Sequence, residues 1–354
     1  MKPQFENNHS FHPSLTHKKI TRLTVALCLG FALCVWMGAD TQVSAQTPPA
    51  KKIVMKFGHL QATDSAIHMG AMKFAELMKE KTGGQAEVQI FPNSQLGNAK
   101  SQLQAVNVGG QDMFVDGIGW YVDYDKDWTP LALGFAIKSR SEMIKILDSP
   151  VGKELEARLL KQGIRVGAYN WWKGDRCLIS RKPIPTVNEL KNIKMRVPSK
   201  AFFVTWQALG SQPVVIAWAE LFIALQQGVV DAAEGPIGDL YTMKLYEPAR
   251  NLTLTRHLVN TAAVSISERL FKGWPPAIQK AVLEAAVEAG EAQTRFQLHQ
   301  EREALQKMKE AGVKVHETNV AAWQAKVKDL PEKAEAEGQW SKGLWARIQA
   351  VIKK

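Results

Sequence analysis

The chain has 354 residues, which is enough for one or two domains with their own hydrophobic cores. Its 45 Lys and Arg residues outnumber 34 Asp and Glu residues and give a formal net charge of +11, a balance typical of proteins that bind nucleic acid, an anionic membrane or small anions. Because the basic residues are dispersed among acidic ones, without the basic runs or aromatic–basic alternation of single-strand nucleic-acid binders, the composition favours a small anionic ligand.

Residues 1–45 have the features of a cleaved export signal. Lys18, Lys19 and Arg22 precede an uncharged, mostly apolar run at 23–38, and Val43-Ser44-Ala45 fits a cleavage site. The alternative is an uncleaved membrane anchor, although the run is shorter than the about 20 apolar residues that a spanning helix needs. We therefore expect a soluble protein in the periplasm. Cleavage would leave Cys177 without a disulfide partner, and a buried, inert thiol is the simplest interpretation of it.

Strands and helices alternate in the first part of the mature chain. Strands are predicted at 53–57, 86–91 and 112–115. Helices are predicted at 65–81 and through Leu103 and Val106 to Gly109-Gly110. This βαβαβ order predicts a parallel sheet with right-handed crossovers. Ligands bind beyond the carboxyl ends of such strands, so His59, Asp116 and Gly117 are expected at a cleft.

A helix and a strand follow in the chain before a second βαβ set begins near residue 174. The pattern predicts helices at 141–160, 201–209 and 219–227, and strands at 164–168, 212–216 and 229–233. The fold class is therefore α/β, with the two lobes and hinge of a periplasmic-binding-protein-like fold. We predict that lobe I comprises 51–173 with 261–300, and that lobe II comprises 174–260 with 301–354.

The longest helical pattern runs from residue 277 to about 310 and follows Pro275-Pro276, since proline is tolerated in the first turn of a helix. At 1.5 Å per residue it would span roughly 50 Å, so we expect it to cross both lobes. The competing explanation is a coiled coil. Its heptads are loose and are interrupted by Gly290, so the protein is expected to be a monomer, with a dimer through this helix left open.

Two arginines carry the strongest indication of a binding site. Arg176 follows the Trp-Trp-Lys-Gly-Asp run at 171–175, and Arg196 lies in Lys-Met-Arg-Val-Pro at 194–198, at the end of an extended segment. A guanidinium is planar and permanently charged, and its N–H groups match a carboxylate. Nothing acidic lies next to Arg196 in the sequence to neutralise it. The site therefore suits an organic acid, and the alternative for each arginine is a structural salt bridge.

An arginine alone cannot hold such a ligand. A charged hydrogen bond contributes about 1.5–3 kcal/mol, whereas micromolar binding requires about 8 kcal/mol. Trp171, Trp172 and Trp218 could supply aromatic walls, and Asn170 could place an amide in the cleft. Plain core or hinge packing remains the alternative for each of the tryptophans.

Three segments resemble the solute receptors of tripartite ATP-independent periplasmic (TRAP) transporters, in their C4-dicarboxylate-receptor (DctP-like) branch. They are Phe-Pro-Asn-Ser-Gln-Leu-Gly at 91–97, Leu-Lys-Asn-Ile-Lys-Met-Arg-Val-Pro at 190–198 and Glu-Leu-Phe-Ile-Ala-Leu-Gln-Gln-Gly-Val-Val-Asp-Ala-Ala-Glu at 220–234. They occur in the order and spacing of that family, and the similarity runs from about Lys52 to the C-terminal helices.

The resemblance implies a two-lobed extracytoplasmic receptor that closes on an organic acid and delivers it to TRAP membrane permease subunits. It places the family's carboxylate-binding arginine at Arg196 and a second, less uniform arginine at Arg176. It also places the segment of Glu234 at the ligand, with Gly235 where relatives carry an asparagine, which would enlarge the pocket. A first-lobe contact would fall near Asp116.

Other functions remain open at this point. A secreted enzyme acting on organic acids is disfavoured, because the histidines are scattered and no nucleophile elbow, phosphate loop or dinucleotide fingerprint occurs. No cofactor or metal site is expected. A sensor input for a membrane signalling protein, or a receptor for an ATP-driven permease, would have the same fold. The ligand could be a C4-dicarboxylate, a keto acid, a sugar acid, an aromatic acid or a cyclic amino acid derivative.

Overall fold

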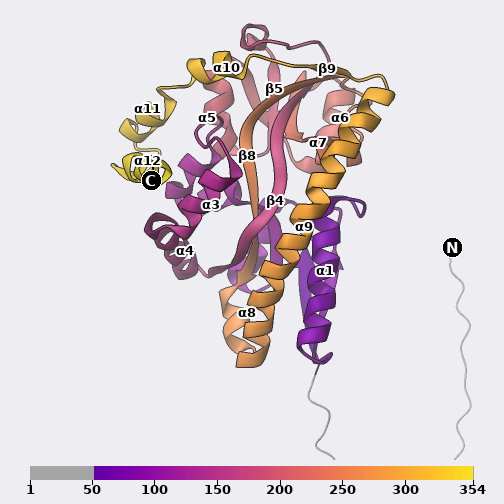
Figure 1. Ribbon diagram of the computed structural model, residues 1–354, viewed down its shortest axis with the longest axis vertical. Coiled ribbons are helices and arrows are strands. Elements are labelled where there is room, and N and C mark those ends of the chain that lie inside the picture. Colours follow the sequence, from indigo (N-terminus) through magenta and orange to yellow (C-terminus); the bar gives the residue numbers. More distant parts are fainter. Residues whose placement is uncertain (1–51, 354) are drawn as a thin grey trace, which may run out of the picture. The chain divides into compact units, whose positions relative to one another are not determined.

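The computed structural model describes residues 52–353, and the predicted export signal at 1–45 lies outside them. The described residues form one mixed sheet of nine strands in the order β2-β1-β3-β8-β4-β7-β5-β6, with β9 paired to β8 (Figure 1). The strands are β1 (Ile53–Gly58), β2 (Ala86–Phe91), β3 (Met113–Gly117), β4 (Ile164–Ser180), β5 (Lys194–Val197), β6 (Gln212–Val215), β7 (Ala232–Pro236), β8 (Asn251–Ser267) and β9 (Lys314–His316).

Helices cover the sheet and connect its strands. The α-helices are α1 (Ala66–Lys81), α2 (Ala99–Val108), α3 (Arg140–Asp148), α4 (Pro150–Lys161), α5 (Lys200–Ala208), α6 (Leu221–Gln226), α7 (Ile237–Thr242), α8 (Glu268–Gly273), α9 (Pro276–Glu310), α10 (Val320–Lys326), α11 (Leu330–Ala336) and α12 (Leu344–Lys353). The 3-10 helices are η1 (Ile118–Asp123), η2 (Lys126–Ala132), η3 (Val187–Leu190) and η4 (Trp218–Glu220). No helix within residues 52–353 is both long and apolar enough to cross a bilayer.

The first three strands confirm the predicted parallel arrangement, since β1 pairs in parallel with both β2 and β3. The Ser65 side chain accepts a hydrogen bond from the His68 amide and so caps α1, which then buries Ile67, Phe74 and Met78 against the sheet. Met69, on the same helix, faces solvent. This unit positions the carboxyl ends of β1 and β3.

The two central strands, β4 and β8, are each 17 residues long and run antiparallel through the middle of the sheet (Figure 1). One half of β8 pairs with β3, and the far half of β4 pairs with β7. The register of the two strands shifts between Trp172 and Asp175, and again between Arg176 and Leu178. Such irregularities redirect side chains, and these lie where the two halves of the sheet meet.

Three predicted boundaries were wrong in this region. The strand predicted at 164–168 continues to Ser180. The strand predicted at 229–233 begins later, as β7, because the chain is still turning after α6 as far as Asp231, whose amide donates to the Lys194 carbonyl. The helix predicted at 141–160 is two helices. Pro150 has no N–H for a continuous helix, and the Ser149 side chain instead accepts the amides that begin α4.

The second half of the sheet holds β5 between β6 and β7, all mutually parallel. Met195 and Val197 of β5 are fully buried between α5 and the central strands, in one cluster with Trp206 and Leu258. Arg196 alternates with these residues and so faces the opposite side of the sheet. The strand therefore fixes the direction of the Arg196 side chain by burying its two neighbours.

The long helix α9 has 35 residues and confirms the predicted span. Its first half packs Val282 and Ala289 into the cluster of α1 and β1–β3, whereas its second half packs Ala304 and Met308 against α6 and α7. Gly290 permits close contact with β4, because a Cβ atom there would lie 2.3 Å from the Asn170 Oδ1 atom. The helix therefore contacts both halves of the sheet (Figure 1).

The C-terminal helices also contact both halves. Trp323 of α10 packs beside β5 and α5, but Leu344 and Ile348 of α12 join a cluster with Met143 of α3. The sequence division assigned 301–354 to lobe II, whereas α12 packs on helices assigned to lobe I. The lobe boundaries themselves stay a prediction.

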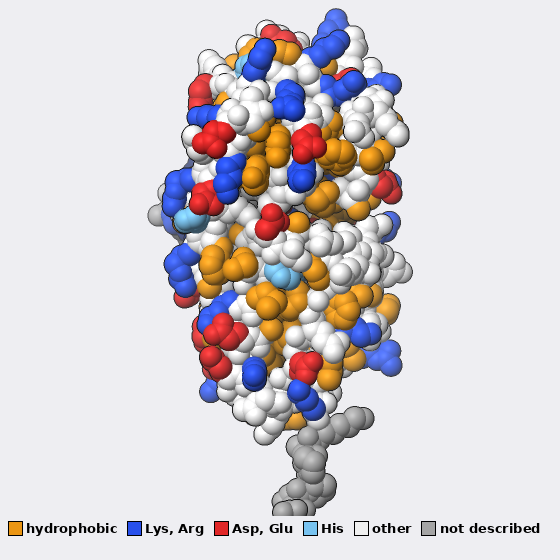
Figure 2. Space-filling view, turned by 90° about the vertical axis from the view of Figure 1, so that its right-hand side faces the viewer, with side chains coloured by type: hydrophobic (Ala, Val, Ile, Leu, Met, Phe, Trp, Pro, Cys, Tyr) orange, Lys and Arg blue, Asp and Glu red, His pale blue; other side chains and the backbone are white. Residues whose placement is uncertain are grey.

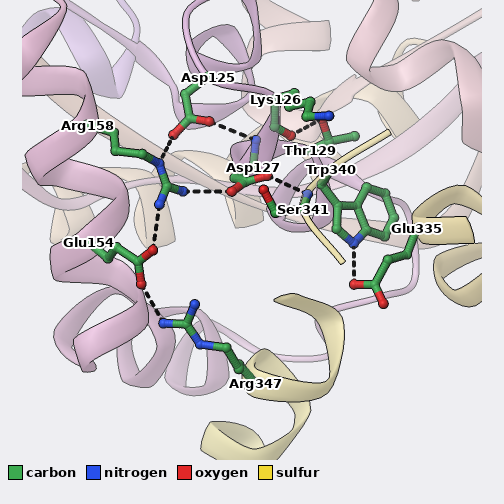
Figure 3. A network of polar contacts seen from close by, with 10 residues as sticks. All are labelled: Asp125, Lys126, Asp127, Thr129, Glu154, Arg158, Glu335, Trp340, Ser341 and Arg347. Atoms are coloured by element: carbon green, nitrogen blue, oxygen red, sulfur yellow. Dashed lines mark hydrogen bonds and ion pairs between the residues drawn. The ribbon is translucent and has the colours of Figure 1, made fainter. Parts of the chain in front are cut away.

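A network of ion pairs holds α12 to α4 (Figure 3). Arg158 contacts Asp125 Oδ2 at 2.7 Å, Asp127 Oδ2 at 3.0 Å and Glu154 Oε1 at 2.8 Å. Arg347 of α12 then contacts Glu154 Oε2 at 2.5 Å. Arg158 is thus shared among three carboxylates, and Arg347 contacts one of them, so these side chains fasten α12 to α4 through contacts within the protein.

The α1–α9 face carries apolar side chains interspersed with charged ones (Figure 2). Its exposed apolar residues are Met69, Met72, Val287, Phe296 and Leu298. Both the expected monomer and the alternative of a dimer through α9 stay predictions.

Candidate functional site

A cavity of about 640 Å³ lies between the two halves of the sheet. Five residues that were expected at a site from the sequence line it: Asp116 and Gly117 at the end of β3, Arg176 on β4, Arg196 on β5 and Trp218 in η4. The volume is in the range of small-molecule sites, which is about 300–1,000 Å³. The structure therefore brings together residues that are up to about a hundred positions apart in the chain.

Arg196 is a buried cation without an ion-pair partner among the described residues. Its side chain is 1% exposed, its Nε atom donates to the Ile216 carbonyl at 2.9 Å, and its Nη1 atom has no hydrogen-bond partner in this part of the chain. Burial, together with the nearby Arg176, lowers the pKa of Arg196. The guanidinium also lies 5.5 Å from the Trp218 ring centre. An anion would supply the missing partner.

Arg176, in contrast, is already paired. Its Nη2 atom donates to Glu234 Oε1 at 2.6 Å and its Nε atom to Glu234 Oε2. Burial acts to lower the pKa of Arg176, but the Glu234 carboxylate outweighs it and the pKa is raised. Burial would raise the pKa of Glu234, but Arg176 and His257 hold it at about 2. The pair forms a wall of the cavity that carries no net charge.

His257 completes this arrangement from β8. Its Nε2 atom lies 3.1 Å from Glu234 Oε2, and its Nδ1 atom lies 2.8 Å from the Thr255 hydroxyl. Burial lowers the pKa of His257, so the ring is neutral at pH 7 and donates to Glu234 through Nε2. The histidine therefore orients the carboxylate that holds Arg176.

Lys173 is the third buried cation at the cavity. Its Nζ atom lies 2.5 Å from Asp116 Oδ1 and 3.5 Å from Asp239 Oδ2. Asp116 Oδ1 also accepts a hydrogen bond from the Gly117 amide at 2.8 Å. Burial raises the pKa of Asp239. Lys173 is therefore engaged by two carboxylates, and Arg196 is the buried cation that lacks one.

The remaining wall is partly apolar and aromatic. Phe202 lies 5.1 Å from the Arg176 guanidinium, and Trp218 covers Arg196. Gly235 lies behind Trp218, since a Cβ atom there would be 3.7 Å from the indole. The cavity therefore offers flat, apolar surface beside the free cation.

Three aromatic-segment candidates lie outside the cavity wall and fasten β4 to α9 instead. Trp171 is fully buried and donates from Nε1 to the Ala286 carbonyl at 2.9 Å, and the Trp172 backbone exchanges two hydrogen bonds of 2.8 Å with the Gln293 amide. Asn170 donates to the Val287 carbonyl at 2.9 Å. The packing interpretation of this segment fits the structure, and these residues position the strand that carries Lys173 and Arg176.

His59 also lies outside the wall. It is fully buried, its Nε2 atom lies 3.1 Å from His68 Nδ1, and burial lowers the pKa of His59 to about 3. Glu234 contributes to the site by bonding Arg176, and Gly235 contributes by packing behind Trp218. Within residues 52–353, no group of three or more His, Cys, Asp or Glu side chains is placed to hold a metal ion.

The wall also contains residues that were not predicted from the sequence, among them Lys173, Ser199, Asp239 and Asn260. Strand alternation would put Lys173 opposite Arg176, but the register shift after Trp172 turns both toward the cavity. Asn260 lies on β8, which was not recognised as a strand. Ser199 directly follows the Arg-Val-Pro motif at 196–198, and that position could have been read from the sequence.

Comparisons with known proteins agree with this architecture. The model of the bacterial extracellular solute-binding protein family 7, DctP, matches residues 57–337. The 2,3-diketo-L-gulonate-binding periplasmic protein YiaO of Escherichia coli (strain K12) is 31% identical over 263 residues, which is 74% of this chain and 80% of its own length. The C4-dicarboxylate-binding periplasmic protein DctP of Rhodobacter capsulatus is 30% identical over 296 residues, covering 81% and 89% of the two chains.

A solved structure extends the similarity to three dimensions. The TRAP periplasmic solute-binding protein from Ochrobacterium anthropi with bound L-fuconate has a TM-score of 0.80 and 28% sequence identity, covering 85% of this chain and 99% of its own. The family consists of solute receptors, which confirms the expectation of a binding protein rather than an enzyme. The chain belongs to the DctP family of bacterial extracellular solute-binding proteins, the solute receptors of TRAP transporters.

Proposed function

We propose that this TRAP solute-binding protein holds a small organic acid by its carboxylate on Arg196 and delivers it to TRAP permease subunits in the membrane. The observation that carries the proposal is the Arg196 Nη1 atom, which is buried without a hydrogen-bond partner among the described residues. A buried polar atom left unpaired costs about 1–3 kcal/mol, and more when it is charged. A carboxylate that bonds this nitrogen removes that cost as it binds.

Closure of the two halves around the ligand follows from where the wall residues lie. Asp116 and Gln61 come from the half of the sheet that contains β1–β3, Asn260 comes from the central strand β8, and Arg196 and Trp218 come from the half that contains β5–β7. A ligand that contacts both halves binds a closed arrangement more tightly than an open one. That difference in affinity is what shifts the population toward closure.

Export to the periplasm belongs to the same proposal. Residues 1–45 have the pattern of a cleaved signal, and YiaO and the Rhodobacter capsulatus relative are periplasmic by name. Those two relatives are named for 2,3-diketo-L-gulonate and C4-dicarboxylates, and the solved relative holds L-fuconate, which are all carboxylates. They support the ligand class but differ in the acid itself.

A thermal-shift screen of the purified protein against organic acids tests the proposal, because a ligand that binds the native state raises its melting temperature. Calorimetry with the acids found then compares the wild type with Arg196→Lys. We expect the variant to lose at least tenfold in affinity, since an ammonium cannot reproduce the planar fork and about 1.4 kcal/mol corresponds to tenfold. Arg295→Lys, an exposed change on α9, is the matched control. Equal affinity of wild type and Arg196→Lys would contradict the proposal.

A further inference from the structure

Several polar atoms on cavity-lining residues have no hydrogen-bond partner among the described residues. Besides Arg196 Nη1 these are Ser199 Oγ, Trp218 Nε1, Asn260 Nδ2 and Gln61 Oε1. All five side chains line the same cavity, and buried polar groups in proteins are nearly always paired. Their unmet hydrogen bonds therefore describe the groups that a ligand has to bring.

The five atoms fall into two sets. Arg196, Ser199 and Trp218 belong to the half with β5 and β6 and can all donate, so together they suit one carboxylate. Gln61 follows β1 in the other half, and Asn260 lies on the central strand β8, where its Oδ1 atom would be 3.1 Å from a Cβ atom at Gly117 of β3; both are neutral amides. An amide offers both a donor and an acceptor, so its partner at this end has to accept and donate. A hydroxyl group does both in either amide orientation, whereas a carboxylate only accepts.

The charges at the amide end point in the same direction. Asp116 lines the cavity there, and its Oδ1 atom is taken by Lys173 and by the Gly117 amide. Its second oxygen makes no hydrogen bond within residues 52–353 and so remains an acceptor for a hydroxyl. A second ligand carboxylate would meet Asp116 and Asp239 there, and Lys173 already pairs with both.

Building on the proposed function, we infer that the ligand is a hydroxylated monocarboxylate, such as an aldonic or uronic acid, with its carboxylate on Arg196 and its hydroxyl groups on Gln61, Asp116 and Asn260. The buried wall then discriminates against dicarboxylates. The hydroxyl groups leave no amide unpaired and place no negative charge beside Asp116.

Two lysines at the cavity rim, Lys100 and Lys200, do not change this inference. Both are exposed, and an exposed ion pair contributes only about 0–1 kcal/mol. A distal carboxylate that reached them would gain less than it loses by leaving the buried amides unpaired. Their positive charge instead attracts anions of either kind toward the cavity.

Calorimetry with matched acids tests the inference. The panel pairs aldonates with aldarates of the same stereochemistry: threonate with tartrate, xylonate with xylarate, gluconate with glucarate and galactonate with galactarate. Within each pair the two acids differ at one end only, where a carboxylate of the aldarate replaces the terminal CH2OH group of the aldonate. Hexanoate, which has one carboxylate and no hydroxyl group, and glucitol, which has hydroxyl groups and no charge, complete the set. The tightest aldonate should bind at least tenfold more tightly than its aldarate, hexanoate and glucitol.

Asp116→Asn provides a second arm, because it keeps the shape of the side chain, removes its charge and leaves Lys173 with Asp239 as its only carboxylate partner within residues 52–353. The variant should accept the aldarate at least tenfold better relative to its aldonate than the wild type does. Asp64→Asn, an exposed change of equal charge outside the cavity wall, should leave that ratio as in the wild type.

The outcomes separate this inference from the proposed function. Suppose that an aldarate or hexanoate binds the wild type better than every aldonate and that Arg196→Lys still abolishes binding. This result overturns the inference that the ligand is a hydroxylated monocarboxylate, and it leaves the proposed receptor function intact. An unchanged ratio in Asp116→Asn also overturns that inference. If Arg196→Lys does not weaken the binding of an aldonate, that result contradicts the proposed function instead.

Discussion

A buried guanidinium with an unpaired nitrogen destabilises the protein that carries it, because desolvation of the charge is not offset by an ion pair. Arg196 is in this position, whereas Arg176 is bonded to Glu234 through two nitrogen atoms. The two arginines therefore differ in what they do. Arg176 satisfies a buried acid within the protein, and Arg196 is left to satisfy an acid that arrives from outside.

Substitution of each arginine by methionine should change stability in opposite directions. Arg196→Met removes an uncompensated charge, and we expect the ligand-free variant to gain about 1–3 kcal/mol in free energy of unfolding. Arg176→Met leaves Glu234 buried without its partner and should cost about 3–5 kcal/mol. Denaturant unfolding of both variants without ligand measures the difference. Equal destabilisation by the two changes would mean that Arg196 is satisfied within the protein.

At the scale of the elements, β4 and α9 form the connection between the two halves. Hydrogen bonds donated by Asn170, Trp171 and Gln293 join the middle of the strand to the helix. Next along the strand, Gly174 has a φ of +86°, and a Cβ atom there would lie 2.8 Å from Glu301 Oε2. Glycine thus allows α9 to approach the strand where the register shifts.

Glu301 makes this connection sensitive to pH. Burial raises the pKa of Glu301 to about 7; the nearby Asp175 adds a smaller increase, and Arg256 opposes it. A carboxyl whose pKa is higher in the folded protein than its value of 4.5 when unfolded stabilises the fold at low pH, and that contribution is lost as the pH rises through 7. Charge on Glu301 therefore disfavours the folded state above neutral pH.

Glu301→Gln should remove this effect. The variant should unfold at a higher temperature than the wild type at pH 8, and the difference should shrink as the pH falls to 5, because the wild-type carboxyl is then protonated. Melting curves across pH 5–8 test this, with Glu291→Gln, an exposed acid on the same helix, as the control. A difference that does not vary with pH would show that Glu301 titrates normally.

The elements differ in how well the sequence predicts them. Apolar patterns bounded by glycine or proline located β1, α1, the end of α2, β5 and α9 closely. In contrast, β8 alternates apolar and polar residues only at its two ends, Leu-Thr-Leu-Thr at 252–255 and Val-Ser-Ile-Ser at 264–267, and its middle does not, so it was not predicted as one long strand. Arg196 could be predicted because its strand is regular. Lys173 and Asn260 could not, because one depends on a register shift and the other on β8.

Within residues 52–353, the molecule places a buried, unpaired guanidinium and a set of unpaired amides in the wall of one cavity, and long strands and one helix connect the two halves of the sheet. Neither side can satisfy the other's groups without a ligand between them. Closure and recognition therefore depend on the same contacts, and the hydroxylated acid that completes them also holds the halves together.

The crystal structure of the protein with the acid found in the screen tests the central claim most directly. We expect one ligand carboxylate with an oxygen at about 2.7–2.9 Å from Arg196 Nη1, the usual length of a charge-assisted hydrogen bond. A carboxylate bound by the exposed lysines of the rim, with Arg196 Nη1 still unpartnered, would contradict it.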